Sequence, residues 1–258
     1  MSEAEKRAAG GRALWREPAP VHFDSAIPWW VKLGVMLALL AGAFLIDEPV
    51  ARWAAATEPL PTGGDKFREL MHLEQFGQWV SSVVVIAAVA LLDRAGRRKA
   101  LALALACGIT ALASHLLKDV VGRGRPNLFF LPGYQPHFEW ARLGFLGWGE
   151  GFHEHYKFGS FPSAHTTGAF ALATGLAWFY PRGRGLFLVL ALGTAAQRVL
   201  HHEHFVSDTI SGMILAVGIV RLVLGWNVPG RLIGAMPEGA RKWWMAESGF
   251  SQPPSVFS

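Results

Sequence analysis

Residues 162–180 read PSAHTTGAFALATGLAWFY, so a proline, a serine and a histidine open a long run of apolar side chains. A hydrocarbon core of about 30 Å needs roughly 17 to 25 helical residues, and this run is long enough to cross one. Proline with serine is common at the first turn of a helix. Ionisable residues at the edge of such a run are costly unless they line a site. The stretch therefore predicts a membrane helix that begins at a polar site.

Five further runs pass the same filter, and the composition of the chain agrees with a location in lipid. The 258 residues are 52% hydrophobic and 17% charged, with a mean hydropathy of +0.28, which is too apolar for an ordinary soluble domain of this length. Small residues are scattered through the runs, as close helix contacts in a bilayer favour. We therefore predict an all-α polytopic membrane protein whose six transmembrane helices cover residues 29–46, 76–92, 100–117, 163–180, 185–201 and 206–226.

Basic residues cluster in alternate joining segments, and this pattern predicts the orientation of the chain. With six crossings, the basic groups before residue 29, at 94–99, at 182–184 and after residue 226 all fall on one side. The positive-inside rule assigns that side to the cytoplasm. We expect an integral protein of a bacterial inner membrane with both termini in the cytoplasm. Three polar motifs, at residues 118–126, 162–165 and 198–208, then lie on the periplasmic or extracellular face.

The domain organisation follows from this orientation. The outer face receives loops 47–75 and 118–162, and the second loop is expected to contain short extramembrane helices between spans three and four. A net charge of +5 and 11 Trp suit a protein that meets anionic headgroups, and no nucleic-acid partner is expected. The chain divides into a cytoplasmic segment 1–28, a membrane domain 29–226 and a cytoplasmic tail 227–258 that contains a short amphipathic helix around 240–246.

Three cations lie where the third apolar run ends, in the stretch KDVVGRGRP at residues 118–126. Pro126 biases Arg125 away from helical geometry and marks a break in the helix. A single Lys or Arg at a helix end can simply extend its charge to the interface, which is the structural alternative. Three cations, Lys118, Arg123 and Arg125, on a face where basic residues are scarce favour an anion site, and a phosphoryl group needs such charge.

The second polar motif is PSAH at residues 162–165. The structural alternative for Ser163 is a helix N-cap. An anion at this helix start would also meet free backbone N–H groups, the positive end of the helix dipole and the serine hydroxyl. His165 extends from the first turn into the same region, although a lone histidine at an interface is more often only a polar group. The motif thus predicts a second wall of the same anion site.

The third motif is RVLHHEHFVSD at residues 198–208. His204 and Asp208 are four residues apart, so on a helix they share a face, and the carboxylate can set the tautomer of the imidazole. Such a histidine can attack phosphorus while a second imidazole protonates the leaving oxygen. A metal site built from the histidines of this motif is disfavoured, because the HExxH spacing is missing and consecutive residues diverge around a helix. The single cysteine, Cys107, lies in an apolar run and adds no metal ligand.

Lys-x6-Arg-Pro, Pro-Ser-x-His and Arg-x5-His-x3-Asp, in this order and at the edges of apolar runs, resemble the type 2 phosphatidic acid phosphatase superfamily, which includes vanadium haloperoxidases. The resemblance covers about residues 76–226. It implies that His204 is a nucleophile oriented by Asp208, that His165 is the general acid, and that no divalent metal or other cofactor is required. It also implies that the phosphate is held by Lys118, Arg125, Ser163, Arg198 and the backbone N–H of Ala164 or His165.

Two positions depart from the family pattern. Ala164 replaces the usual glycine of the second motif, so the turn there must suit an ordinary residue. Gln197 replaces the usual serine before the arginine of the third motif and still offers hydrogen bonds. Neither change removes a group that the chemistry needs.

The function that these residues and the resemblance imply is hydrolysis of a lipid phosphate in the outer leaflet through a phosphohistidine. Polyprenyl pyrophosphate, lipid A, phosphatidylglycerophosphate and phosphatidate all suit that face, and the resemblance does not choose among them. Two alternatives stay open at this point. A lipid phosphotransferase would use the same phosphohistidine, and a non-enzymatic lipid transporter would not need His165, His204 and Asp208 together.

Overall fold

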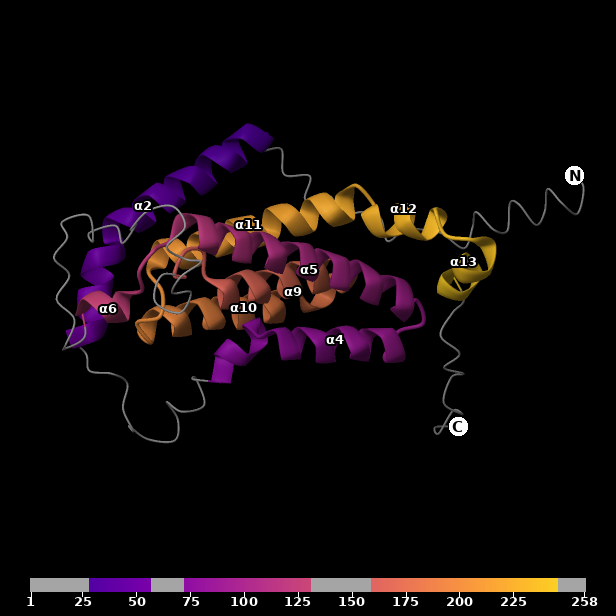
Figure 1. The fold of residues 1–258 in the computed structure, drawn as a ribbon, viewed down its shortest axis with the longest axis horizontal. Helices are drawn as coiled ribbons and strands as arrows, with labels where there is room; N and C mark the ends of the chain where they lie inside the picture. Colours follow the sequence, from indigo (N-terminus) through magenta and orange to yellow (C-terminus); the bar gives the residue numbers. More distant parts are fainter. Residues whose placement is uncertain (1–27, 57–71, 131–158, 246–258) are drawn as a thin grey trace, which may run out of the picture.

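The computed structural model describes residues 28–56, 72–130 and 159–245, and within these ranges every regular element is a helix (Figure 1). The described parts contain one isolated parallel β-bridge, between Arg123 and Gly159. This confirms the all-α prediction. The elements in chain order are α2 (Trp29–Ala56), η1 (His72–Gly77), α4 (Trp79–Leu92), α5 (Gly96–Val121), α6 (Pro126–Phe130), α9 (Ala164–Phe179), η3 (Pro181–Gly183), α10 (Arg184–Leu200), α11 (Val206–Gly225), α12 (Val228–Gly234) and α13 (Glu238–Met245).

Each of the six apolar runs forms one long helix, but the helices differ in length. Three of them, beginning at Trp30, Gly96 and Val206, are long and apolar enough to cross a bilayer. Helix α4 is apolar but has 14 residues, while α9 and α10 have 16 and 17. Six crossings therefore remain a prediction, although six helices at the expected positions are a finding.

The predicted loop 47–75 is wrong at its beginning, because α2 continues to Ala56. Asp47 lies inside this helix with 2% of its surface exposed. Its carboxylate accepts hydrogen bonds from Arg123 and from the backbone N–H of Ser207. Because the carboxylate of Asp47 is paired inside the protein, it does not need to face water. The helix can therefore continue past this acidic residue.

Helix α9 forms the centre of the bundle and packs against α5, α10 and α11 (Figure 1). Small residues line it: Ala169 and Ala171 have no exposed surface, and a side chain at Gly175 would collide with Leu103 of α5. Small residues let helix backbones approach closely where lipid supplies no hydrophobic drive for association. The outer helices instead expose large apolar side chains such as Leu45, Leu91 and Val189.

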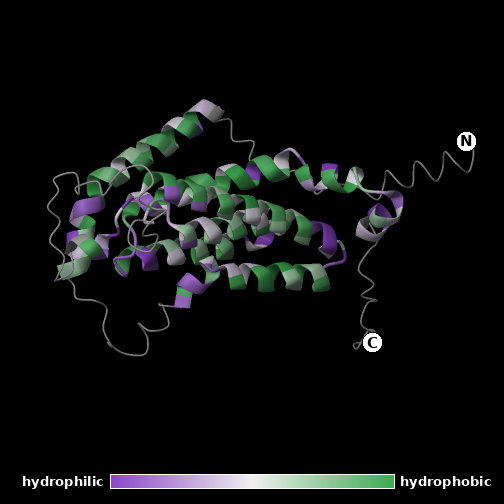
Figure 2. Ribbon diagram, in the orientation of Figure 1, coloured by the Kyte–Doolittle hydropathy of each residue, from purple (hydrophilic) through white to green (hydrophobic). Residues whose placement is uncertain are grey.

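Polar residues gather at the two ends of the bundle, with an apolar middle between them (Figure 2). At one end, Asp93 after α4 accepts hydrogen bonds from Lys99 at 2.6 Å and from the hydroxyl of Tyr180 at 3.0 Å. There, too, Arg97 donates to the backbone carbonyl of Trp243 in α13, the short helix expected in the tail. The motifs lie at the other end, so the basic joining segments and the motifs occupy opposite ends.

Candidate active site

The segment after α5 is hydrogen-bonded to the segment just before α9. Gly122 ends α5 in the left-handed region with φ 59°, and its N–H donates to the carbonyl of Lys118 at 3.1 Å. A glycine takes this conformation without steric cost, so the chain can reverse immediately. Ser160 then donates its N–H to the carbonyl of Arg123 at 2.9 Å. The first motif is therefore fixed against residues that lie just before the second.

His204 and Asp208 face each other with Ser160 beside both, but His204 lies in the turn before α11 and not on the helix that their spacing assumed. His204 Nδ1 lies 3.6 Å from Asp208 Oδ2, and Ser160 donates its hydroxyl to the same oxygen at 2.6 Å. His204 is 2% exposed. Burial lowers the pKa of His204 well below the ordinary value of 6.5, and the nearby carboxylate of Asp208 opposes this only in part. The imidazole is therefore neutral at neutral pH and keeps a lone pair for attack.

Arg123 does not belong to the anion site, contrary to the prediction from the first motif. Its side chain has no exposed surface, and Nη1 donates to Asp208 at 2.5 Å while Nη2 donates to Asp47 at 2.8 Å. The guanidinium also lies over the ring of Phe205 at 4.2 Å. A buried cation with two carboxylate partners is held for structure and orientation, since displacing them would leave charges buried and unpaired.

Four residues of this network were missed in the sequence. Asp47 and Ser207 bind each other as well as Arg123, and Ser160 and the backbone N–H of Phe205 both donate to Asp208. The one available signal was Asp47 itself, an acidic residue at the end of an apolar run.

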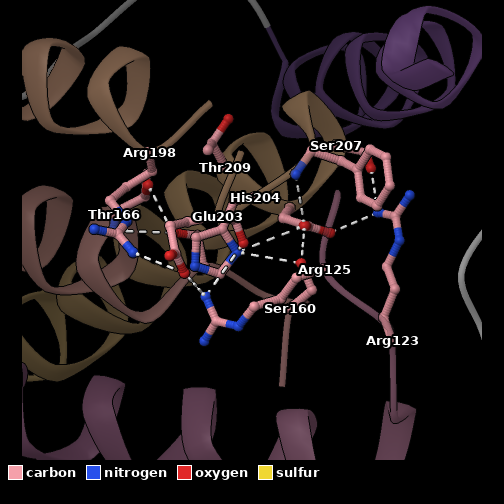
Figure 3. Close-up of polar contacts among 12 residues, drawn as sticks. Arg123, Arg125, Ser160, Thr166, Arg198, Glu203, His204, Ser207 and Thr209 are labelled. Carbon is pink, nitrogen blue, oxygen red and sulfur yellow. Dashed lines mark hydrogen bonds and ion pairs between the residues drawn. The ribbon is translucent and has the colours of Figure 1, made fainter. Parts of the chain in front are cut away.

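The three remaining cations lie close enough to influence one another. Lys118, at 3% exposure, donates to the carbonyl of Gly159 and is repelled by Arg125 and Arg198. Arg125 donates to the carboxylate of Glu203 at 2.5 Å. Figure 3 shows Arg125, Arg198 and Glu203 together, with His204 beside them. The predicted phosphate-binding cations are thus brought to one place, next to the proposed nucleophile.

Two carboxylates accompany these cations and were not predicted. Arg198 donates to Glu74 of η1 at 2.6 Å and lies 3.4 Å from Glu203. Gln197, the departure from the family pattern, donates to the same oxygen of Glu74 at 3.1 Å. The side chain that replaces the usual serine therefore helps to hold the partner of Arg198.

Ser163 is the N-cap of α9, as its structural alternative stated. Its hydroxyl oxygen accepts from the N–H of Thr166 at 3.4 Å, and its own N–H donates to the carbonyl of Asp208 at 3.0 Å. A role for Ser163 or the Ala164 N–H in phosphate binding stays a prediction. His165 is half-buried in the first turn of α9 and interacts electrostatically with the same charged cluster. Among these charges, Arg198 has the largest effect on it.

The turn between α10 and α11 has an unusual backbone. His202 adopts φ 56°, a left-handed conformation that is uncommon outside glycine. It lets the N–H groups of Glu203 and His204 both point back to the carbonyl of Arg198, each at 3.2 Å. The turn thereby places a carboxylate and the proposed nucleophile side by side. In the described ranges, the acidic, histidine and cysteine side chains form no group of three or more that could hold a metal ion.

The sequence profile of the PAP2 superfamily, the type 2 phosphatidic acid phosphatases, matches residues 99–230. The chain belongs to the PAP2 superfamily. The match runs from α5 to α12 and contains all three motifs, so the resemblance drawn from those motifs is confirmed. Helices α2 and α4 lie before it, and Asp47 therefore reaches the PAP2 region from outside.

Three curated relatives align with parts of the chain. Lipid A 1-phosphatases of Rhizobium etli and Rhizobium johnstonii are 32% and 34% identical over 104 residues, which is 40% of this chain and 40% and 38% of theirs. A probable lipid phosphate phosphatase 4 of Arabidopsis thaliana is 28% identical over 136 residues, 45% of this chain and 44% of its own. The chain thus aligns with about two fifths of the length of these relatives.

The fold is similar to a crystal structure of a transmembrane PAP2 type phosphatidylglycerolphosphate phosphatase from Bacillus subtilis. The TM-score is 0.52 at 21% sequence identity, and the alignment covers 77% of this chain and 95% of that one. At this identity the likeness concerns the fold alone. His137, His153 and His155 of the second outer loop, for which the sequence leaves open a role as surface groups or as headgroup contacts, lie outside the described residues.

Proposed function

We propose that this PAP2 protein is a metal-independent phosphatase that removes a terminal phosphate from a membrane lipid. One observation carries the proposal: a buried histidine, His204, backed by Asp208, lies beside Arg125, Arg198 and Lys118 at one end of an apolar helix bundle. Such a place suits a substrate whose phosphate is polar and whose chains remain in lipid. The names of the lipid A and lipid phosphate phosphatases among the relatives point to the same class.

The proposed first step is attack of His204 on phosphorus. Its Nδ1 faces Asp208, so the other ring nitrogen, Nε2, carries the attacking lone pair. The N–P bond forms as the bond from phosphorus to the lipid oxygen breaks, and His165 gives its proton to that oxygen. The carboxylate of Asp208 stabilises the positive charge that develops on the ring of His204.

The second step returns the enzyme to its starting state. Water attacks the phosphohistidine, His165 takes a proton from that water, and the N–P bond breaks to release inorganic phosphate. Lys118, Arg125 and Arg198 oppose the charge on the equatorial oxygens throughout, which is the main requirement of phosphoryl transfer. Ser163 and the Ala164 N–H complete the proposed cradle at the start of α9.

The proposed location follows from the difference between the two ends of the helix bundle. The basic joining segments lie at one end and the proposed site at the other, and under the positive-inside rule this supports a site on the outer face of a bacterial inner membrane. The substrates considered are therefore outer-leaflet lipids with a phosphomonoester or a pyrophosphate.

A phosphate-release assay over such lipids tests the proposal. The purified protein in detergent micelles is given phosphatidate, phosphatidylglycerophosphate, lipid A and a polyprenyl pyrophosphate, each with and without EDTA and with vanadate. We expect release from at least one lipid, no loss with EDTA, inhibition by vanadate, and loss of release in His204→Ala and His165→Ala. Glu238→Gln, an exposed residue of α13, serves as the control. Full release by His204→Ala, or loss with EDTA, would overturn the proposed mechanism.

A further inference from the structure

Glu203 occupies the space between two arginines that are proposed to bind the substrate phosphate. Its Oε2 atom lies 2.5 Å from Arg125 Nη1 and 3.4 Å from Arg198 Nη2 (Figure 3). The Arg125 Nη1 atom also donates to the backbone carbonyl of Glu203 at 3.2 Å. The carboxylate therefore bridges the pair in the way that a phosphate oxygen would.

Glu203 differs from the other carboxylate at the site. Glu74 contacts Arg198 and Gln197 through one oxygen and does not bridge to Arg125 in the described contacts. Glu203 precedes His204 directly, in the turn set by the left-handed His202. Its side chain keeps 22% of its surface exposed, against 12% for Arg125 and 10% for Arg198. Of these three side chains, Glu203 is therefore the one with the most access to solvent.

A ligand must compete with this carboxylate for the two guanidinium groups. Charge-assisted bonds from arginine to a carboxylate or a phosphate are similar in kind, so the number of charges and acceptor oxygens decides the exchange. A phosphomonoester carries about −1.5 to −2 charges near pH 7 and offers three free oxygens. A phosphodiester carries one charge and two free oxygens, like the carboxylate that it would replace.

We propose that Glu203 is a specificity-determining residue that keeps phosphodiester headgroups out of the arginine pair and yields to phosphomonoesters. The inference rests on the proposed function, because it takes Arg125 and Arg198 as phosphate ligands. Its physical basis is the membrane itself: most phospholipid headgroups are diesters, and they surround the site at high local concentration. An arginine pair without a resident carboxylate would bind them and would be blocked to substrate.

Binding of a phosphodiester and of inorganic phosphate to the purified full chain tests the proposed role of Glu203. The probes are inorganic phosphate as the dianionic ligand and dihexanoyl phosphatidylglycerol as the monoanionic diester, each titrated by calorimetry in detergent. We expect the Glu203→Gln variant to bind the diester about tenfold more tightly than the wild type, because a neutral amide competes weakly for a guanidinium. The affinity for inorganic phosphate should rise by less, so the ratio of the phosphate affinity to the diester affinity should fall. Glu203→Asp, which keeps the charge, should stay near the wild-type ratio.

The outcomes separate this inference from the proposed function. Unchanged or weaker diester binding by Glu203→Gln would overturn it and would indicate that Glu203 only orients the arginines. Glu203→Ala, which removes the carboxylate without adding an amide, gives the same test if Glu203→Gln does not fold. Because calorimetry needs no turnover, a chain that releases no phosphate from any lipid can still show the shift. Glu238→Gln, far from the site, should bind both probes as the wild type does.

Discussion

Arg123 connects Asp47 of α2 to Asp208 of α11, at 2.8 Å and 2.5 Å, through a side chain with no exposed surface. Asp208 in turn lies 3.6 Å from the ring of His204. A helix outside the region matched to the PAP2 superfamily thus bears on the orientation of the proposed nucleophile. The buried chain of charges makes α2 part of the site, although no residue of α2 was proposed to touch the substrate.

Replacing Arg123 by lysine tests this connection. Lysine keeps the charge but loses the planar fork that reaches two carboxylates at once. We expect the free energy of unfolding to fall by about 3 kcal/mol, near the lower end of the cost of breaking a buried pair. We also expect kcat to fall by about tenfold or more, because Asp208 is less firmly held. Thermal denaturation in detergent and phosphate release measure the two effects. Arg52→Lys, at an exposed pair with Glu48, should change neither.

The depressed pKa of His204 predicts a pH dependence of stability. The unfolded chain binds a proton near the ordinary value of 6.5, whereas the folded chain resists protonation because His204 is buried. The unfolded state therefore binds more protons as the pH falls below about 6.5, and stability is lost in that direction. As the pH is lowered from about 8 to about 5, the melting temperature of the wild type should fall more steeply than that of His204→Gln. Equal slopes would contradict the assignment of a buried neutral imidazole.

The close approach of α11 to the start of α9 depends on Gly212. A Cβ atom there would lie 2.7 Å from Thr167 Oγ1 and 2.9 Å from the carbonyl oxygen of Ser163, both too short for contact. Gly212→Ala should therefore displace the start of α9, lowering both kcat and the melting temperature. Gly218→Ala, in the same helix with open space around it, is the matched control and should be neutral or stabilising by up to about 1 kcal/mol. Equal melting temperatures for the two variants would contradict this packing.

The left-handed backbone of His202 predicts a difference between two substitutions. Asparagine adopts positive φ readily, whereas a β-branched residue is a genuine outlier there. Both His202→Asn and His202→Ile lose the imidazole, so loss of that ring cannot account for a difference between them. We expect His202→Ile to be less stable than His202→Asn by about 1–3 kcal/mol and to have the lower kcat, since Glu203 and His204 follow in the turn. A pair of variants with the same melting temperature and kcat would show that the turn carries no such strain.

Several features of the fold and the site could be predicted from sequence because they depend on local patterns. Apolar length placed six helices, since a helix of given hydrophobic length needs no knowledge of its neighbours. The predicted start of the fourth run at residue 163 agrees with Ser163 as the N-cap of α9. The contact between His204 and Asp208 was also expected, although His204 lies in the turn before α11 and not on the helix itself. The three motifs met at one end because consecutive helices reverse direction.

The sequence alone therefore determined the helices, the pairing of His204 with Asp208 and the family to which the chain belongs. Only the tertiary structure decided that Arg123 is enclosed between Asp47 and Asp208, while Arg125 and Arg198 share Glu203. The three arginines have the same chemistry and lie in similar motifs, so composition and spacing cannot separate them. What separates them is which carboxylate each one meets. Except for Glu203 beside Arg198, those partners are distant in the chain and are brought together by packing around α9.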